Sequence, residues 1–371
     1  MPTYGRPGIH TGEEMLKLKS SYYKRDSLAL KEGALIFPIA LAGFIAGGVL
    51  AVFISPLFGV WSLAAQIVIP QFTMLGACVL YCHFRYINIV DSLRVKTLSG
   101  KQIVLLPVVT LATVFAFAPI AQLFVWILTE LGYNSTGLPL DEDMPGMVYL
   151  VIFALIVVLP AIVEEAVFRG YILSGLKKKG ATFALLMSSL LFMLMHGSPT
   201  QTVHQFMLAL VMGYTVIVSD SLLAGSIVHL ANNSFGVMAI SILTMLNGGW
   251  IIWVIVFVFG IILLPGLLFV FTKLSEEKKS PVPFVLGWMP VTQQGGAPYS
   301  IGEKPIDWFD SIATFYKGLF KSLTFKGIKA ALKSFDDKYT PNAQARKARL
   351  PALLFVAIGV AMLLWVLELL I

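Results

Sequence analysis

The chain has 371 residues, of which 57% are hydrophobic and only 13% are charged, and its mean hydropathy is +0.83. Soluble domains carry about 25% charged residues, so this composition excludes an ordinary soluble protein and predicts a chain that crosses a membrane several times. The formal net charge of +7 fits basic loops beside a lipid bilayer, and no basic patch stands apart from the apolar segments, so we expect no nucleic-acid partner.

The N-terminal third contains a charged segment followed by three apolar segments. Residues 1–32 are rich in charged residues, and we expect them to form a short cytoplasmic helix. Pro107 and Pro119 are expected to interrupt the third apolar segment. The three segments cover about 33–54, 61–82 and 102–129. We assign them together as N-terminal transmembrane helices within residues 33–130.

Further apolar segments follow a central stretch that begins at residue 147. They cover about 181–196, 203–219, 222–246, 250–272 and 350–371. Counting every apolar segment predicts about eight or nine transmembrane helices. The expected fold class is therefore all-α: a polytopic helical membrane protein with a polar site in its core.

Lysine and arginine gather in one set of loops. The loop at residues 130–146 contains acidic residues but no lysine or arginine. Because basic loops stay in the cytoplasm, we expect loop 130–146 outside and the N-terminus inside an integral, multi-pass membrane protein. The basic segments, all assigned to the cytoplasm, are 1–32, 83–101, 177–180 and 273–349.

The polar segment 273–349 divides into two parts. Residues 280–305 are rich in proline, glycine and glutamine and are expected to form a linker. From Ile306 onward, aromatic and aliphatic residues recur at helical spacing among lysines. This pattern predicts basic amphipathic helices on the anionic cytoplasmic leaflet, followed by a last transmembrane helix at 350–371.

The central apolar stretch contains three ionisable residues, Glu164, Glu165 and Arg169. Charged groups deep in hydrocarbon are unfavourable by at least a few kcal/mol each, so they mark a functional site. Glu165 and Arg169 are four residues apart, share a helix face and can neutralise one another. Glu164 is rotated by about 100° from that face, which leaves its carboxylate available for chemistry.

Four other polar residues lie in later apolar segments: His196, His229, Asn232 and Asn233. At a rise of about 1.5 Å per residue, Glu164, His196 and Asn233 all lie about 20–24 Å from the nearest cytoplasmic boundary. A single histidine or asparagine in a membrane usually bonds a neighbouring helix, but matched depth on three helices favours a shared site. Pro160 is expected to kink its helix and open space beside Glu164.

These residue types allow hydrolysis of an amide without a serine or cysteine nucleophile. A carboxylate and a histidine can activate water, and a second histidine with an amide can stabilise an oxyanion. The alternative is a zinc site with one open position at Glu164, His196 and His229. The spacing H-E-x-x-H is absent, so we expect no cofactor and keep zinc as the alternative.

Three motifs in residues 147–246 resemble those of the CPBP family, which comprises type II CAAX prenyl endopeptidases and bacteriocin-processing proteins. They occur in the family's order within an all-helical chain, which makes the combination specific. They are E-E-x-x-x-R at Glu164, Glu165 and Arg169, F-x-x-x-H at Phe192 and His196, and H-x-x-x-N at His229 and Asn233.

The resemblance implies an intramembrane endopeptidase with its catalytic core at 147–246. By motif, Glu164 and His196 would activate the water, whereas His229 and Asn233 would hold the oxyanion. The supporting residues would be Glu165, Arg169 and Phe192.

The resemblance also bears on the chemistry, substrate and location. The residue set favours a glutamate-type peptidase over a zinc-dependent one. The substrate would be a prenylated peptide, a leader peptide or a membrane protein, and the expected location is the plasma membrane of a prokaryote.

Two other classes of function use the same polar residues. A non-catalytic bacteriocin-immunity or membrane scaffold protein would use the site for binding. A proton-coupled transporter would use Glu164 as a carrier group, but it predicts inverted repeats, and the other half of the chain has no second E-E segment. The transporter is therefore ranked last. His10, His83 and His204 lie in a tail or near the ends of segments, and we assign them no role.

Overall fold

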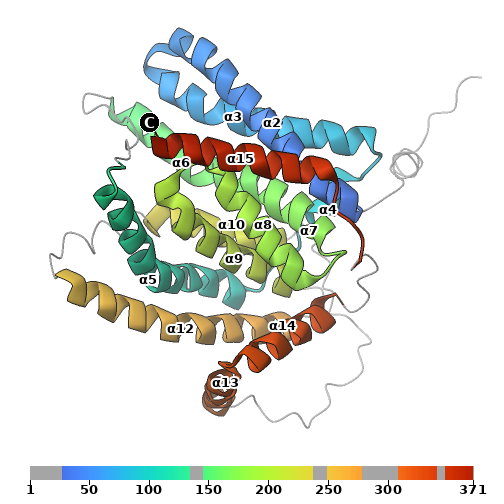
Figure 1. Ribbon diagram of the computed structural model, residues 1–371, viewed down its shortest axis with the longest axis vertical. Coiled ribbons are helices and arrows are strands. Elements are labelled where there is room, and N and C mark those ends of the chain that lie inside the picture. Colours follow the sequence, from blue (N-terminus) through green and yellow to red (C-terminus); the bar gives the residue numbers. More distant parts are fainter. Residues whose placement is uncertain (1–26, 134–144, 237–248, 278–307, 341–346, 371) are drawn as a thin grey trace, which may run out of the picture.

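The computed structural model describes residues 27–133, 145–236, 249–277, 308–340 and 347–370 (Figure 1). Within these ranges the chain is helical and contains no strand, which confirms the expected all-α class. Several expectations fall outside the described residues: most of the N-terminal helix in 1–32, most of loop 130–146, the end of segment 222–246 and the linker 280–305.

The first two apolar segments form a helical hairpin at one edge of the molecule (Figure 1). Helix α2 (Leu30–Ile54) and helix α3 (Ser62–Phe84) are joined by the short 3₁₀ helix η1 (Ser55–Trp61). Gly59 in this turn has φ 55° and ψ −122°, a conformation that side chains disfavour. A Cβ at Gly47 would lie 1.9 Å from Thr73 Oγ1, so glycine lets the two helices approach closely.

Helix α5 (Gly100–Glu130) follows the short helix α4 (Ile89–Leu93) and differs from the expectation for its segment. Pro107 and Pro119 both lie inside one continuous helix, so the expectation that they interrupt it is wrong. Proline removes one backbone hydrogen bond, and membrane helices tolerate that loss by bending, as the curve of α5 shows (Figure 1). Helix α12 (Gly249–Glu277) packs along α5 on the side opposite the hairpin.

The helices between these two layers form the centre of the molecule (Figure 1). Helix α6 (Gly146–Glu165) continues into a π-helical segment, η2 (Ala166–Leu173), and a last turn, α7 (Ser174–Leu176). The remaining central elements are α8 (Ala181–Met195), η3 (Pro199–Gln201), α9 (Thr202–Ser219), α10 (Leu222–Ala231) and a second π-helical segment, η4 (Asn232–Gly236).

Three C-terminal helices surround this centre. Helices α13 (Trp308–Ser322) and α14 (Phe325–Tyr339) lie near the C-terminal end of α12, and α15 (Ala352–Leu370) packs against α2 and α8 (Figure 1). The indole of Trp365 in α15 donates a hydrogen bond to Thr202 Oγ1 at the start of α9, at 2.8 Å. Helix α15 is thus attached to the rest of the molecule by its packing against α2 and α8 and by the hydrogen bond from Trp365 to Thr202.

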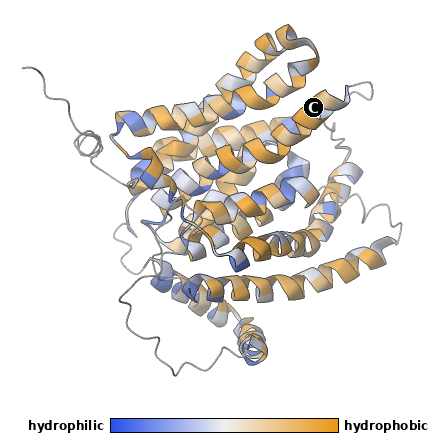
Figure 2. Cartoon of the chain, turned by 180° about the vertical axis from the view of Figure 1, so that it is seen from behind, coloured by the Kyte–Doolittle hydropathy of each residue, from blue (hydrophilic) through white to orange (hydrophobic). Residues whose placement is uncertain are grey.

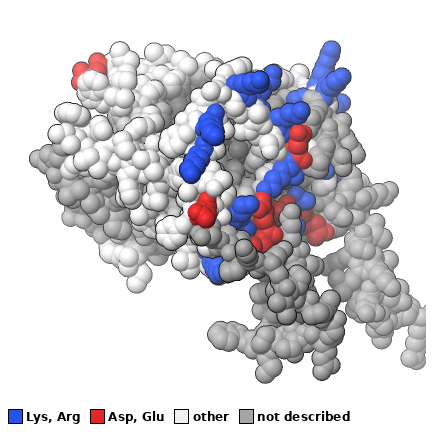
Figure 3. Space-filling model, turned by 90° about the horizontal axis from the view of Figure 1, so that it is seen from below, with Lys and Arg blue, Asp and Glu red and all other residues white. Residues whose placement is uncertain are grey.

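Six helical stretches in the described part of the chain are long and apolar enough to cross a membrane. The first, Leu30–Phe84, contains the hairpin, and the shorter apolar helix Ala181–Met195 lies in the centre. Apolar residues cover the outer helices (Figure 2), whereas Lys and Arg gather with several acidic residues toward one side (Figure 3). The chain is a polytopic helical membrane protein.

Candidate active site

Glu164 and Glu165 end helix α6 immediately before the π-helical segment η2. Their side chains point to different surroundings, because neighbouring residues on a helix are separated by about 100°. The Glu165 side chain is 0% exposed and the Arg169 side chain is 1% exposed, and Arg169 Nη1 lies 2.8 Å from Glu165 Oε1. The Glu164 side chain is 14% exposed. Only the Glu164 side chain is therefore partly exposed.

Glu165 connects the central helices to one another. Its Oε1 atom also accepts a hydrogen bond from His229 Nδ1 of α10 at 3.1 Å. Arg169 Nη2 donates to the Ala209 carbonyl of α9 at 3.3 Å. Gly225 of α10 leaves room for this carboxylate, since a Cβ there would lie 2.5 Å from Glu165 Oε2. The pair of Glu165 and Arg169 thus joins α6 and η2 to α9 and α10.

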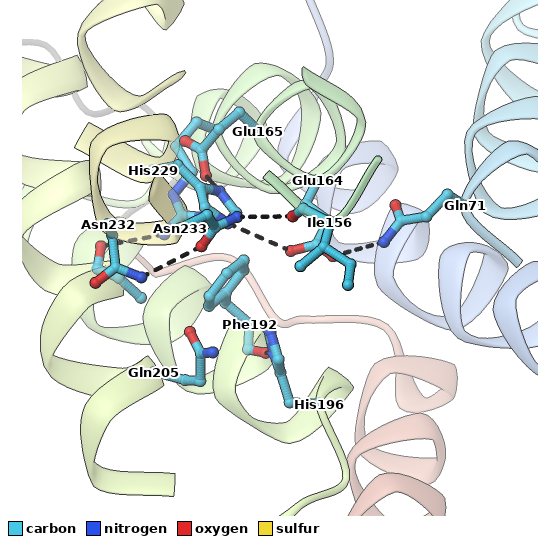
Figure 4. A network of polar contacts seen from close by, with 12 residues as sticks. Gln71, Ile156, Glu164, Glu165, Phe192, His196, Gln205, His229, Asn232 and Asn233 are labelled. Carbon is cyan, nitrogen blue, oxygen red and sulfur yellow. Dashed lines mark hydrogen bonds and ion pairs between the residues drawn. The ribbon is translucent and has the colours of Figure 1, made fainter. Parts of the chain in front are cut away.

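Glu164 has one oxygen held by the protein and one that is free. Gln71 Nε2 of α3 donates to Glu164 Oε1 at 2.7 Å (Figure 4). Glu164 Oε2 is buried and forms no hydrogen bond with the part of the chain that the structure describes. The nearest cationic group to it is His229 Nε2, at 4.0 Å. This separation is too long for a direct hydrogen bond.

His229 lies between the two glutamates (Figure 4). Because Glu165 Oε1 accepts a hydrogen bond, the hydrogen that it receives is placed on His229 Nδ1. Nε2 then faces Glu164. Two carboxylates and one guanidinium give this group a net charge of −1 when His229 is neutral, and an imidazolium would balance it.

Phe192 of α8, expected as a supporting residue, contacts three other residues of the site. Its carbonyl accepts a hydrogen bond from His196 Nδ1 at 2.9 Å, and the two rings have a centroid distance of 4.7 Å. The same ring lies 5.8 Å from the His229 ring and 4.4 Å from Arg169 Cζ. The Phe192 ring therefore contacts both histidines (Figure 4) and forms a cation–π interaction with Arg169.

Asn232 and Asn233 begin the π-helical segment η4. Asn233 Nδ2 donates to the Ile156 carbonyl of α6 at 3.4 Å, and Asn233 Oδ1 accepts from Asn232 Nδ2 at 3.3 Å. The helix of the H-x-x-x-N motif is thus attached to the helix of the two glutamates. π-Helical segments occur frequently at functional sites, and here one follows the glutamates and the other contains the asparagines.

Gln71 and His204, to which the sequence analysis assigned no role, also contact residues of this group. Gln71 holds Glu164, and its one available signal was an amide inside an apolar segment of α3. His204 Nε2 of α9 lies 3.2 Å from Asn232 Oδ1, so His204 contacts the site although no role was assigned to it. Nothing in the spacing of His204 distinguishes it from a histidine at the end of a helix.

The geometry of the described residues bears on the zinc alternative at Glu164, His196 and His229. Zinc in proteins needs three or four ligand atoms at about 2.0–2.3 Å from one point. No group of three His, Cys, Asp or Glu side chains in the described ranges is arranged to hold a metal ion. His229 Nδ1 is bonded to Glu165 and His196 Nδ1 to the Phe192 carbonyl, so Nε2 is the only ring nitrogen of each histidine that is left for another partner.

Comparison with known proteins gives one match. Residues 146–235, about a quarter of the chain, match the family model of type II CAAX prenyl endopeptidase Rce1-like proteins. No curated protein and no solved structure gives a match. The matched segment contains the glutamate pair, Phe192, both site histidines and Asn233, whereas Gln71 lies outside it. The resemblance expected from the three motifs is confirmed over residues 146–235, which are similar to this family of endopeptidases.

Proposed function

We propose that this protein is an intramembrane endopeptidase in which Glu164 activates a water molecule. The observation that carries the proposal is the contrast between the two adjacent glutamates. Glu165 is fully buried and its Oε1 is paired with Arg169 and His229, whereas the Glu164 side chain is 14% exposed and forms no ion pair with a lysine or arginine of the described residues. A general base must not be neutralised by a fixed cation and must lie where a substrate can approach, and of the two glutamates Glu164 fits this description better.

The first step places water between Glu164 and the histidines. A water that forms hydrogen bonds of about 2.8 Å to Glu164 Oε2 and to His229 Nε2 can bridge their separation of 4.0 Å. His196 donates from Nδ1 to the Phe192 carbonyl, so the Nε2 of its neutral ring is an acceptor for the second hydrogen of the water. Glu164 takes the other proton as the water oxygen attacks the scissile carbonyl carbon.

The second step stabilises the tetrahedral intermediate and releases the amine. His229 acts as an imidazolium from the start, so that Nε2 donates first to the water oxygen and then to the oxyanion, while Nδ1 stays bonded to Glu165. Asn233 has two amide hydrogens, and one of them remains for the oxyanion while the other bonds the Ile156 carbonyl. Glu164 then gives its proton to the leaving nitrogen as the carbon–nitrogen bond breaks, which restores the carboxylate.

The mechanism is of the glutamate type, and chelation tests it. Because no group of three His, Cys, Asp or Glu side chains in the described ranges is arranged to hold a metal ion, we expect metal chelators to leave the rate of peptide cleavage unchanged. The measurement is cleavage by the purified protein before and after dialysis against a chelator, with metal content measured in parallel. A rate that falls on dialysis and returns with added Zn²⁺ would contradict this mechanism.

The substrate that we propose is a peptide or membrane-protein segment that reaches the site from the cytoplasmic side. A prenylated peptide and a leader peptide both fit this class. The support is the family match together with the lysines and arginines that gather toward one side of the molecule, which under the positive-inside rule is cytoplasmic (Figure 3). We place the protein in the plasma membrane of a prokaryote with its N-terminus inside.

The experiment compares membrane and released peptides from cells that express the wild type with those that express Glu164→Gln at equal protein level. New peptide termini that occur only with the wild type are the expected result, and they identify the substrate. Identical peptide profiles, with a cellular phenotype that still depends on the protein, would instead favour the non-catalytic immunity or scaffold function.

A further inference from the structure

A single apolar stripe runs along α14, and the rest of the protein covers only part of it. Phe325, Ile328 and Leu332 recur at intervals of three and four residues, so they share one face, and all three are exposed, Phe325 by 88%. Phe335 continues the same stripe but stacks on Tyr214 of α9, with a centroid distance of 5.8 Å. The stripe is thus anchored at its C-terminal end and uncovered at its start.

Helix α13 repeats this arrangement. Phe315 stacks on Phe269 of α12 with a centroid distance of 4.6 Å, which holds α13 against α12. Phe309 and Phe320 are eleven residues apart and therefore lie on one side of the helix. They are 90% and 67% exposed. We call the exposed residues Phe309, Phe320, Phe325, Ile328 and Leu332 the apolar edge.

Lysines border the apolar edge on both helices. None of them forms an ion pair with a residue in the ranges that the structure describes. Lys338, by contrast, pairs with Glu276 of α12 and so fastens α14 to the rest of the protein. An exposed apolar stripe bordered by lysines is typical of helices that lie in the headgroup region of an anionic membrane. The bordering lysines are Lys317, Lys321, Lys326, Lys329 and Lys333.

The two helices lie where a bilayer surface is available. Helix α12 belongs to the stretches that can cross a membrane, and α13 and α14 contact it toward its C-terminal end (Figure 1). Tyr316 of α13 donates a hydrogen bond to the Ile262 carbonyl of α12, whose side chain is exposed on the outer surface. The exposed apolar surface of α12 therefore adjoins α13.

We propose that α13 and α14 form a binding surface for the anionic lipid headgroups of the leaflet beside them. The apolar edge enters the boundary between headgroups and acyl chains, and the five bordering lysines contact the lipid phosphates. The occupant is lipid because the edge adjoins the lipid-facing side of α12 and because unpaired lysines complement anionic headgroups. The proposal does not depend on peptide hydrolysis.

The test uses the full chain in vesicles with a nitroxide label on a single engineered cysteine. Cys78 and Cys82 are both buried, so labelling can be directed to an exposed position. The two positions are Phe320→Cys on the apolar edge and Ser334→Cys on an exposed part of α14 away from the edge. Collision with oxygen reports contact with the acyl region, and collision with a nickel chelate reports contact with water.

In vesicles of phosphatidylcholine and phosphatidylglycerol, we expect the Phe320 label to gain oxygen collisions and lose nickel collisions severalfold relative to the Ser334 label. Replacing the five bordering lysines with glutamine should abolish this difference between the two labels. Vesicles of phosphatidylcholine alone should abolish it as well. An unchanged thermal unfolding temperature of that variant in detergent would show that it folds.

Three results would overturn the proposal. The Phe320 label could be as open to the nickel chelate as the Ser334 label in anionic vesicles. It could be shielded equally in both kinds of vesicle and in the lysine variant, which would mean that headgroup charge is not recognised. It could also be shielded from both reagents, which would mean that protein covers the edge.

Discussion

At the scale of single residues, two identical neighbours have opposite surroundings. The carboxylate of Glu165 is paired with Arg169 and His229 in a fully buried group, whereas that of Glu164 is bonded by the neutral amide of Gln71 and its side chain is 14% exposed. Helix geometry alone predicts that they face different directions. Which partners they meet depends on α3, α9 and α10, so the same substitution at the two positions should have different consequences.

The first prediction compares Glu164→Gln with Glu165→Gln. Glu164→Gln keeps the shape and the hydrogen bond from Gln71 but removes the base, so we expect activity to fall by about 10²–10⁴-fold with unchanged thermal stability. Glu165→Gln leaves Arg169 buried without its counter-charge, which should destabilise the fold by about 3–5 kcal/mol. Cleavage rates and thermal unfolding in detergent measure the two effects. Equal loss of stability in both variants would contradict this division of roles.

The second prediction concerns Gln71. Gln71→Leu fills the same space but removes the donor that holds Glu164 Oε1, so we expect kcat to fall about 10- to 100-fold with little change in KM. Gln66→Leu in the same helix is the matched control, because Gln66 bonds Ser55 and Ser62 instead. A fully active Gln71→Leu protein would show that Glu164 does not need this residue.

At the scale of elements, close approaches between helices decide how the site is held. α10 can lie against Glu165 because Gly225 has no side chain, and η2 and η4 change the helical repeat next to the glutamates and the asparagines. The extra residue in each π-helical turn alters which side chains face the site. The spacing of apolar residues along a segment does not reveal such local changes in the helical repeat.

The third prediction compares two Gly→Ala substitutions in helices. In Gly225→Ala the new Cβ would lie 2.5 Å from Glu165 Oε2, so we expect a destabilisation of about 1–3 kcal/mol together with loss of activity. In Gly76→Ala of α3 nothing lies within 4 Å of the new Cβ, and the change should be neutral or slightly stabilising. Thermal unfolding and cleavage rates check both. Two variants of equal stability would show that α10 can shift away from Glu165.

At the scale of the whole molecule, the C-terminal helices complete the segment that matches the family. Helix α8, which ends next to His196, has no side-chain cap of its own at Gly180. Asp336 Oδ1 of α14 instead accepts a hydrogen bond from Thr182 N at 2.7 Å, and Thr340 Oγ1 accepts from Ala181 N at 3.1 Å. The first amides of a central helix are thus capped from a segment more than 150 residues later.

The fourth prediction follows from this cap. Asp336→Ala removes an anionic acceptor at a helix N-terminus, so we expect a loss of about 0.5–2 kcal/mol and faster amide hydrogen exchange at the start of α8. Ser334→Ala on an exposed part of the same helix is the control and should change neither. Unchanged exchange in Asp336→Ala would mean that α14 does not cap α8 in the membrane.

The sequence by itself determined that this is a helical membrane protein and which residues are out of place in its apolar segments. Both conclusions depend on hydrophobicity and on spacing within one helix, which are local properties. The structure corrected one local expectation, since α5 bends through Pro107 and Pro119 without a break.

Only the tertiary structure decided which of the polar residues meet. Gln71 and Glu164 are 93 residues apart in the sequence, and His229 Nε2 lies 4.0 Å from the free oxygen of Glu164. Spacing along a helix relates residues three or four positions apart, and it does not predict how separate helices rotate against one another. Those rotations are set by packing at positions such as Gly225 and Phe192, where several helices meet.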